Sequence, residues 1–114
     1  MSDCLFCKIM KGEISSDKVY EDDDVFAFND IDPQSPVHVL IIPKKHIAYV
    51  ADMEETDAEL FGKLVLAANK IAKKLDVKEG SYRLVFNNGK LSGQVVFHVH
   101  LHLLANRAMH WPPG

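Results

Sequence analysis

The sequence predicts an α+β fold in which one principal helix packs on a mainly antiparallel sheet. Strand-like segments outnumber helical ones, short turn-rich loops join most of them, and only one long segment has convincing helical periodicity. A chain of 114 residues has room for a single domain, residues 1–114, with a core of its own. Its 47% hydrophobic and 25% charged residues are ordinary values for a globular protein, which argues against a disordered or fibrous chain.

The first half of the chain predicts three strands. Residues 18–20 and 25–28 have strand-like composition and are separated by a short acidic run, which we interpret as a hairpin turn. A turn rich in proline leads into a third strand over residues 37–42. Pro43 is expected to stop that strand, because proline has no backbone N–H to give to a sheet.

The second half predicts the helix and two more strands. Apolar residues such as Leu60, Leu64 and Ala68 recur at three- and four-residue spacing over residues 56–75, which predicts a helix with one apolar face. Thr56 and Glu59 have the spacing of a capping box at its start. Strands are predicted at residues 82–87 and 95–104, with a loop containing two glycines between them.

Three histidines alternate with apolar residues in the last predicted strand, at His98, His100 and His102. Side chains alternate across a strand, so the three imidazoles share one face. The opposite face carries the residues expected in the core, namely Phe97, Val99, Leu101 and Leu103. Such a row of imidazoles is hard to explain by packing alone and indicates a functional site.

The residues leave two chemistries open for these histidines. Imidazoles on one face of a strand can converge on a metal ion, although no carboxylate lies near the three in sequence. A nucleophilic histidine instead needs one ring nitrogen free and the other held by an acceptor. Charge developing on a substrate would then need donors, which Asn87, Gln94, the amides around Gly93 and a protonated His102 could supply.

Residues 98–104 match the alternating signature of the histidine triad (HIT) superfamily. Further segments resemble its Hint branch, the nucleoside phosphoramidases: residues 28–31, 36–38, 42–47, 93–94 and the closing 109–114. The resemblance therefore extends over nearly the whole chain and implies the HIT-like α+β fold.

The resemblance implies hydrolysis of P–N bonds in purine nucleoside 5′-phosphoramidates through a covalent nucleotidyl-histidine, with no cofactor required for catalysis. His100, the middle residue of the triad, would be the nucleophile. His102 would contact the phosphate and help to protonate the leaving amine, and His38 and His98 would be orienting partners. The resemblance also implies a homodimer that binds a purine nucleoside monophosphate in each subunit.

The same resemblance assigns the nucleotide pocket. Asp30 would accept hydrogen bonds from the ribose hydroxyls, and Ile31 would line the purine slot. The remaining contacts would be two apolar walls, Phe6 and Ile9, and a phosphate-binding group, Asn87, Gly93, Gln94 and the amide of Val95. Hint proteins usually carry a serine at the position of Val95, so we expect slower turnover here.

Cys4 and Cys7 form a C-x-x-C pair near the start of the chain. The pair resembles that of several microbial HIT proteins, in which two histidines, corresponding to His46 and His98, complete a structural zinc site. Two sulfur and two nitrogen ligands with no open position suit a structural zinc ion. The alternative is that the cysteines are two small, partly buried apolar residues without a metal.

Composition restricts partners and location. The formal net charge of −3 offers no large basic field, so duplex nucleic acid is not an expected partner. No apolar run approaches the ~20 residues of a membrane span, and no signal-peptide pattern is found, so we expect no membrane partner and a cytoplasmic location, with the nucleus as an alternative. Besides the enzyme, two other functions stay open: a purine-nucleotide-binding regulatory or interaction module, and an enzyme whose histidines hold a catalytic metal.

Overall fold

The computed structural model describes residues 3–114 and contains a five-stranded antiparallel sheet. Its strands are β1 (Lys18–Glu21), β2 (Val25–Asn29), β3 (Val37–Pro43), β4 (Tyr82–Phe86) and β5 (Leu101–Ala105). Their order across the sheet is β1-β2-β3-β5-β4, so β3 and β5 lie side by side near its centre and β4 forms one edge. The predicted α+β fold class is confirmed.

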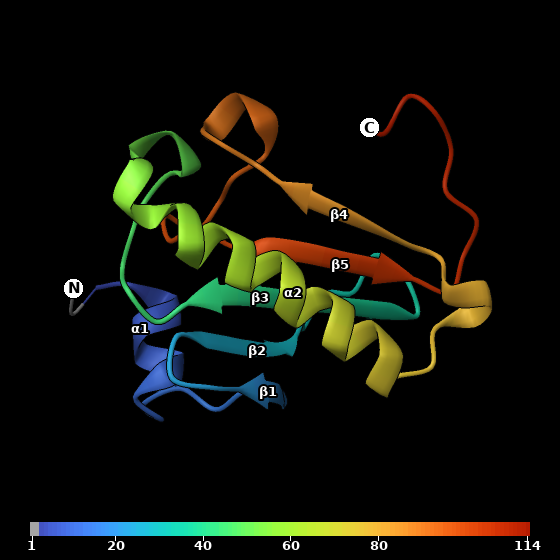
Figure 1. Cartoon of the computed structure of the whole chain (residues 1–114), viewed down its shortest axis with the longest axis horizontal. Coiled ribbons are helices and arrows are strands. Elements are labelled where there is room, and N and C mark those ends of the chain that lie inside the picture. Colours follow the sequence, from blue (N-terminus) through green and yellow to red (C-terminus); the bar gives the residue numbers. More distant parts are fainter. Residues whose placement is uncertain (1–2) are drawn as a thin grey trace.

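Two α-helices flank the sheet. The long helix α2 (Ala58–Lys74) crosses the sheet in front of its central strands, and the short helix α1 (Leu5–Met10) lies near the N-terminus (Figure 1). Four 3₁₀ turns complete the elements: η1 (Val50–Asp52), η2 (Glu55–Asp57), η3 (Lys78–Gly80) and η4 (Lys90–Ser92). Among residues 3–114, no helix is both long and apolar enough to cross a bilayer.

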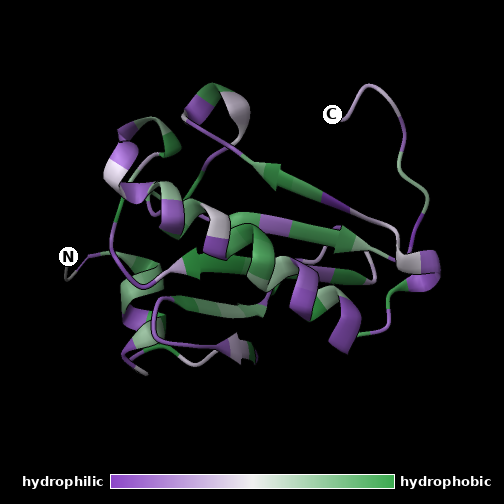
Figure 2. Cartoon of the chain, viewed as in Figure 1, coloured by the Kyte–Doolittle hydropathy of each residue, from purple (hydrophilic) through white to green (hydrophobic). Residues whose placement is uncertain are grey.

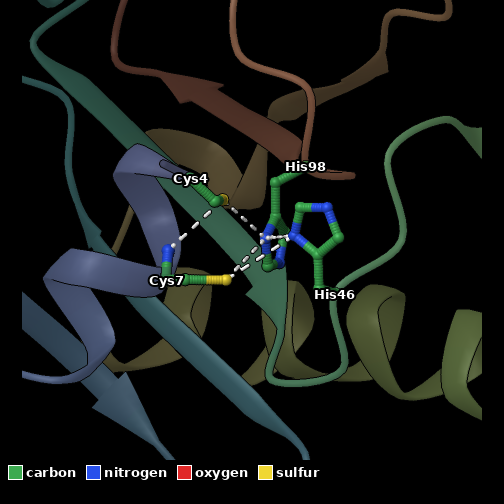
Figure 3. A group of neighbouring side chains, drawn as sticks. All are labelled: Cys4, Cys7, His46 and His98. Atoms are coloured by element: carbon green, nitrogen blue, oxygen red, sulfur yellow. Dashed lines mark hydrogen bonds between the residues drawn. The ribbon is translucent and has the colours of Figure 1, made fainter. Parts of the chain in front are cut away.

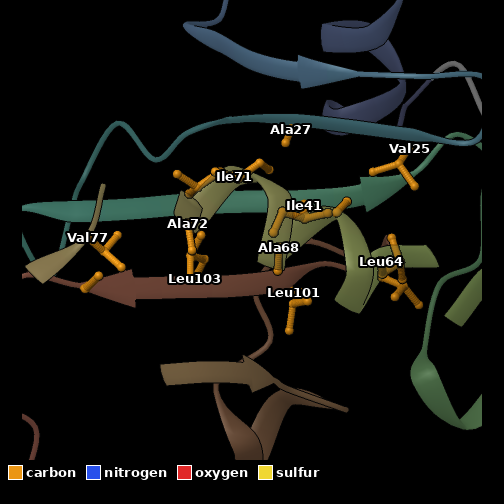
Figure 4. Packing of buried hydrophobic residues seen from close by; sticks show 14 of the residues in the cluster. Val25, Ala27, Ile41, Leu64, Ala68, Ile71, Ala72, Val77, Leu101 and Leu103 are labelled. Carbon is orange, nitrogen blue, oxygen red and sulfur yellow. The ribbon is translucent and has the colours of Figure 1, made fainter. Parts of the chain in front are cut away.

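Strand alternation divides the buried residues into two clusters, one on each face of the sheet. Leu64, Ala68 and Ile71 of α2 pack on Ile41 of β3 and Leu101 of β5 (Figure 4). The smaller cluster lies on the other face, under α1, and contains Phe6, Ile9, Phe26, Phe28, Leu40 and Ile42. Green, apolar segments therefore follow the central strands, whereas α2 alternates between apolar and polar residues (Figure 2).

The last strand is shorter than the predicted 95–104. Strand β5 begins only at Leu101, which pairs with Ile41, and residues 95–100 approach it as an irregular segment. The ladder stops here because β3 ends at Pro43, which has no N–H to donate. Instead, the Pro43 carbonyl accepts a hydrogen bond from the His98 ring at 2.8 Å, and Val99 N–H donates to the carbonyl of Ile47 at 2.7 Å.

Two smaller expectations were also wrong. The capping box is formed by Glu54 and Asp57 rather than by Thr56 and Glu59, so a 3₁₀ turn precedes α2. Phe97 is not in the core: it lies in the irregular segment, at the surface, with its ring against Tyr49 at a centroid distance of 5.7 Å. The alternation resumes correctly at Val99, which is buried in the α2-facing cluster.

Candidate active site and cysteine–histidine cluster

His100 is buried, and one of its ring nitrogens is held by the main chain. Its Nδ1 donates a hydrogen bond to the carbonyl oxygen of His98 at 2.8 Å. A carbonyl can only accept, so Nδ1 carries the proton, and Nε2 of the neutral ring keeps its lone pair. Burial lowers the pKa of His100, opposed by the hydrogen bond to His98 and by the charge of Asp30. The ring therefore has the form that a nucleophile requires at neutral pH.

His38 and His102 form a hydrogen-bonded pair beside His100. The backbone N–H of Gln34 donates to Nδ1 of His38 at 3.0 Å, so the proton of the neutral His38 ring is on Nε2. That Nε2–H donates to Nδ1 of His102 at 2.9 Å. The proton of His102 must then be on its own Nε2, which is buried and is without a hydrogen-bond partner among residues 3–114. The pair thus ends in a donor that a substrate oxygen or nitrogen could satisfy.

Asp30 adds a carboxylate to this pair. Its Oδ2 lies 3.4 Å from Nε2 of His38, and its Oδ1 accepts from the backbone N–H of Asp32 at 2.9 Å. Burial lowers the pKa of His38, an effect that Asp30 and Asp32 partly oppose. Burial also lowers the pKa of His102 to about 4, and the neighbouring rings of His100 and His38 add to the shift. His102 is therefore neutral at pH 7, so the protonated His102 expected as a charged donor is not the resting form.

Asp30, His38 and His102 also bring three possible ligand atoms within 4.8 Å of one another, which is the arrangement a catalytic metal would need. The tautomers instead place the nitrogens of His38 and His102 in a hydrogen bond with each other. With Nε2 of His38 protonated, the 2.9 Å contact to His102 is an ordinary donor–acceptor hydrogen bond. This group therefore has the chemistry of a hydrogen-bonded pair with a carboxylate at one side.

A second cluster joins Cys4 and Cys7 of the α1 region to His46 and His98 (Figure 3). Nδ1 of His98 lies 3.3 Å from the sulfur of Cys4, 3.7 Å from that of Cys7 and 3.1 Å from Nδ1 of His46. The sulfur of Cys7 lies 3.6 Å from Nδ1 of His46. All four residues predicted as metal ligands are thus brought together from three separate parts of the chain.

The donor set and its spacing suit a tetrahedral zinc ion. With Zn–S bonds of about 2.3 Å and Zn–N bonds of about 2.0–2.1 Å, tetrahedral ligand atoms lie roughly 3.3–3.8 Å apart. The measured separations of 3.1–3.7 Å are close to this range. The tautomer of His98 agrees, because its Nε2 donates to the Pro43 carbonyl and leaves a lone pair on Nδ1, inside the cluster.

His98 belongs to both groups of residues, but through different atoms. Its ring lies in the cysteine–histidine cluster, and its backbone carbonyl holds His100. His98 is 0% exposed, and burial lowers its pKa to about 4, assisted by the neighbouring His46 and His100. Its contact with His100 is therefore made through the main chain and not through the imidazole.

Five of the predicted nucleotide-binding residues lie outside the loop of residues 93–95, at three places in the chain. Phe6 and Ile9 are buried in the α1-facing cluster, and the Phe6 ring makes a T-shaped contact with His100 at a centroid distance of 5.1 Å. Asp30 lies beside the His38–His102 pair, and Ile31 next to it is 97% exposed. Asn87, half-buried, follows directly after β4.

The loop expected to hold the phosphate is braced by Gln94. This buried side chain accepts from Gly89 N–H at 2.7 Å and donates to the carbonyls of Ala48 and Val96. Gly93 adopts a positive φ of 103°, which glycine reaches without strain. Val95 is 82% exposed. The side chain of Gln94 thus makes internal contacts, and phosphate binding by this loop stays a prediction.

The sequence reasoning missed the partners that set the tautomers. These are backbone groups: the amide of Gln34, and the carbonyls of Pro43 and His98. No residue-type signal marks them, because every residue offers a carbonyl and all except proline an amide. Only the position of the turn before β3 and the end of β3 place them correctly.

The fold and the site together define a protein with an antiparallel sheet and a triad of buried or half-buried histidines beside its central strands. Residues 11–109 match the HIT domain family. The chain therefore belongs to the HIT domain family, which confirms the superfamily that its histidine signature resembles.

Individual relatives agree with this assignment. A HIT family hydrolase from Legionella pneumophila shares 52% identity with a TM-score of 0.95, over 98% of this chain and 100% of that chain. A histidine triad protein from Clostridium difficile shares 42% identity with a TM-score of 0.92, over 96% of each chain. A HIT-like protein of Synechocystis is 47% identical over 112 residues, which are 98% of this chain and 97% of that protein.

Proposed function

We propose that this protein is a hydrolase of the Hint type that cleaves the P–N bond of purine nucleoside 5′-phosphoramidates. The observation that carries the proposal is the 2.8 Å hydrogen bond from Nδ1 of His100 to the His98 carbonyl. It leaves the Nε2 lone pair of a neutral, buried imidazole as the attacking group. Solved relatives of this chain include a HIT family hydrolase, which supports the hydrolase class.

The proposed reaction has two displacements at phosphorus. Nε2 of His100 attacks the phosphorus, the P–N bond to the amine breaks, and the amine leaves with one added proton. The nucleotide is then bound covalently to His100, and water cleaves this second P–N bond to release the nucleoside monophosphate. Two displacements require mainly positioning and charge stabilisation from the protein, which the histidines grouped around His100 can provide.

His102 is the proposed donor to the phosphate and to the leaving amine. Its Nε2–H has no partner among residues 3–114, and the Gln34–His38 contacts fix that tautomer. At pH 7 the ring begins neutral. The negative charge of a bound phosphate would favour its protonated form, so that the proton becomes available when the substrate is in place.

The proposed nucleotide contacts follow the geometry beside the triad. Asp30 would bind the ribose hydroxyls, with Ile31 against the base and Phe6 and Ile9 as buried walls beneath. The amides around Gly93 and Val95, together with Asn87 and the Gln94 region, would hold the phosphate. Support comes from proximity to the histidines and from the resemblance to Hint proteins.

Hydrolysis of adenosine 5′-phosphoramidate by the wild type and by His100→Ala tests the proposal. We expect turnover by the wild type and near abolition in the variant, with the far-ultraviolet circular dichroism spectrum unchanged. His110→Ala is the matched control, because within residues 3–114 the one hydrogen bond of this exposed histidine is made by its backbone carbonyl, to Arg83. A nucleotide-protein adduct in base-quenched wild type, absent from His100→Ala, would identify the intermediate. A folded wild type that binds AMP without turnover would overturn the enzyme and support a nucleotide-binding module.

We also propose a structural zinc ion in the cysteine–histidine cluster, with Cys4, Cys7, His46 and His98 as its ligands. No open position remains for substrate, so the ion would hold α1 against the segment before β5 without entering the reaction. A cytoplasmic location would keep both thiols reduced and able to bind metal. Metal analysis of protein purified without chelator should give one zinc per chain, and a value far below one would contradict the site.

A homodimer is the proposed assembly. Strand β4 is an edge of the sheet, and next to it α2 exposes apolar side chains: Leu66 is 58% exposed, and Phe61 stacks on Phe86 at 5.0 Å. An unpaired edge strand beside apolar surface suits pairing with a second copy. Sedimentation of the wild type as a dimer and of Leu66→Glu as a monomer would support this, and a monomeric wild type would overturn it.

A further inference from the structure

The cysteine–histidine cluster and the proposed nucleophile are joined through His98. The ring of His98 is fixed at both nitrogens, by the Pro43 carbonyl at Nε2 and by the cluster at Nδ1. The carbonyl of the same residue accepts the proton of His100 Nδ1 at 2.8 Å. A ring held this way restrains its own main chain, so a change in the cluster reaches the group that sets the His100 tautomer.

Phe6 makes a second connection. It lies between the two cysteines in sequence, and its ring makes T-shaped contacts with both histidines, with centroid distances of 5.9 Å to His98 and 5.1 Å to His100. Because Phe6 is buried on α1, a shift of the cysteine-bearing turn also shifts the surface against which His100 packs.

The two thiols are placed for oxidation to a disulfide. The chain contains only these two cysteines, and their sulfurs are among ligand atoms that lie within 4.8 Å of one another. The backbone N–H of Cys7 already points at the sulfur of Cys4, at 3.4 Å. A surface depression lined by Cys4, His46, Val95 and Phe97, among others, gives solvent a path to the half-buried Cys4.

We propose that Cys4 and Cys7 form a reversible disulfide that displaces His98 and thereby lowers the activity of His100. With hydrogen peroxide as oxidant, the two sulfurs lose two electrons and form the S–S bond, and the peroxide O–O bond breaks to give two waters. The two protons come from the thiols, or from solvent if the sulfurs are metal-bound thiolates, in which case the metal ion leaves. A dithiol reductant reverses the step. The regulatory part rests on the proposed hydrolase function.

A disulfide between Cys4 and Cys7 changes the partners of the His98 ring. Its sulfurs have no proton to donate and are far poorer metal ligands than thiolates, so Nδ1 of the fully buried His98 loses both sulfur partners and keeps only Nδ1 of His46, 3.1 Å away. The ring then turns towards His46, its remaining neighbour at Nδ1, and its carbonyl moves with it. His100 can no longer be held with its proton on Nδ1.

The test uses the zinc-loaded full chain before and after stoichiometric peroxide. We expect a mass loss of two hydrogens, release of zinc, an unchanged circular dichroism spectrum and a kcat lower by roughly 10–100-fold with little change in KM. In nitrogen-15 spectra, the ring signals of His100 should change from the form protonated at Nδ1 to a mixture of tautomers. Dithiothreitol with added zinc should restore both readouts, which excludes methionine oxidation as their cause.

Cys4→His is the matched variant, because it keeps four ligands but cannot form the disulfide. Whatever its own starting rate, the ratio of its rates after and before peroxide should be close to one. A disulfide that leaves kcat and the His100 signals unchanged would overturn the proposal, as would failure to form the disulfide or inactivation that merely follows unfolding. If the reduced wild type shows no hydrolysis, the proposed function fails, and the His100 signals alone decide whether the cluster controls the ring.

Discussion

Two pairs of histidines lie on the same side of the sheet and have nearly the same separation, yet they offer opposite chemistry. Nδ1 of His46 and Nδ1 of His98 are 3.1 Å apart, and Nε2 of His38 and Nδ1 of His102 are 2.9 Å apart. The first pair directs its Nδ1 atoms at two cysteine sulfurs, whereas in the second one ring donates to the other and the pair ends in an N–H donor.

The difference is set by what the backbone gives to the outer nitrogen. An acceptor, the Pro43 carbonyl, binds Nε2 of His98 and leaves a lone pair on Nδ1. A donor, the Gln34 amide, binds Nδ1 of His38 and makes Nε2 a donor. The role of a histidine in this protein therefore depends on the neighbouring main chain as much as on its place in the triad. Substitution of His102 disrupts the second pair, and removal of metal disrupts the first.

The largest expected effect comes from removing His102, whose Nε2–H is the free donor of the His38–His102 pair among residues 3–114. His102→Ala should lower kcat by about 10²–10⁴-fold, because the phosphate and the leaving amine lose their donor. Steady-state hydrolysis of adenosine 5′-phosphoramidate measures this, with His110→Ala as the control. A variant within a few-fold of the wild type would show that His102 is not the donor.

Removing metal breaks the other pair and should act on stability. If free zinc exceeds its dissociation constant about a thousandfold, binding contributes about 4 kcal/mol to the free energy of unfolding. Stripping zinc should then lower Tm by roughly 15 °C for a domain of this size. Thermal denaturation with and without chelator checks this. Cys7→Ser should abolish the response, and an equal chelator effect in that variant would place the metal elsewhere.

Much of the fold follows from patterns visible in the sequence. The alternation at Val99, Leu101 and Leu103 correctly predicts which side chains meet α2, because strand geometry ties burial to every second residue. The length of the last strand does not follow from the pattern. The alternation already includes His98 and His100, whereas the strand and its hydrogen-bond ladder begin only at Leu101. The ladder ends at the pair Ile41–Leu101, two residues before Pro43 of the neighbouring strand, and only the register of β3 with β5 places that proline there.

The candidate site divides in the same way. The triad, the cysteine pair and His46 could be named from residue types and from the resemblance to HIT proteins. The role of each ring nitrogen could not be predicted, because the deciding partners are main-chain atoms at Gln34, Pro43 and His98. These atoms have no sequence signature, and the fold alone brings them to the rings.

Acid should weaken the hydrogen-bonded pair of His38 and His102 and so lower the stability of the fold. The pKa of His102 is lowered to about 4 in the folded protein, against about 6.5 for an exposed histidine. The unfolded chain therefore binds more protons between these values, so the stability contributed by neutral His102 is present above pH 6.5 and is lost as the pH falls towards 4. Protonated Nδ1 of His102 can no longer accept from His38.

Urea denaturation at pH 7 and pH 5 measures this loss. The midpoint of the wild type should fall at pH 5, and that of His102→Gln should fall less, because glutamine does not titrate. Release of metal at low pH affects both proteins alike and cancels in the comparison. Equal falls in the two proteins would mean that His102 is not the group responsible.

The smallest effect is expected at Val95, outside both pairs. Its side chain is 82% exposed and belongs to neither buried cluster, so Val95→Ser should change the free energy of unfolding by less than about 0.5 kcal/mol. The new hydroxyl lies next to Gln94, in the loop proposed to hold the phosphate, where it can donate to charge that develops in the transition state. We expect kcat to rise by about 2- to 10-fold, since a single donor at an exposed position stabilises that charge only modestly.

Val95→Ala removes the same apolar surface without adding a donor and should show no gain. An equal gain in both variants would mean that valine slows the reaction by its bulk, and no gain in either would mean that the histidine pairs alone set the rate.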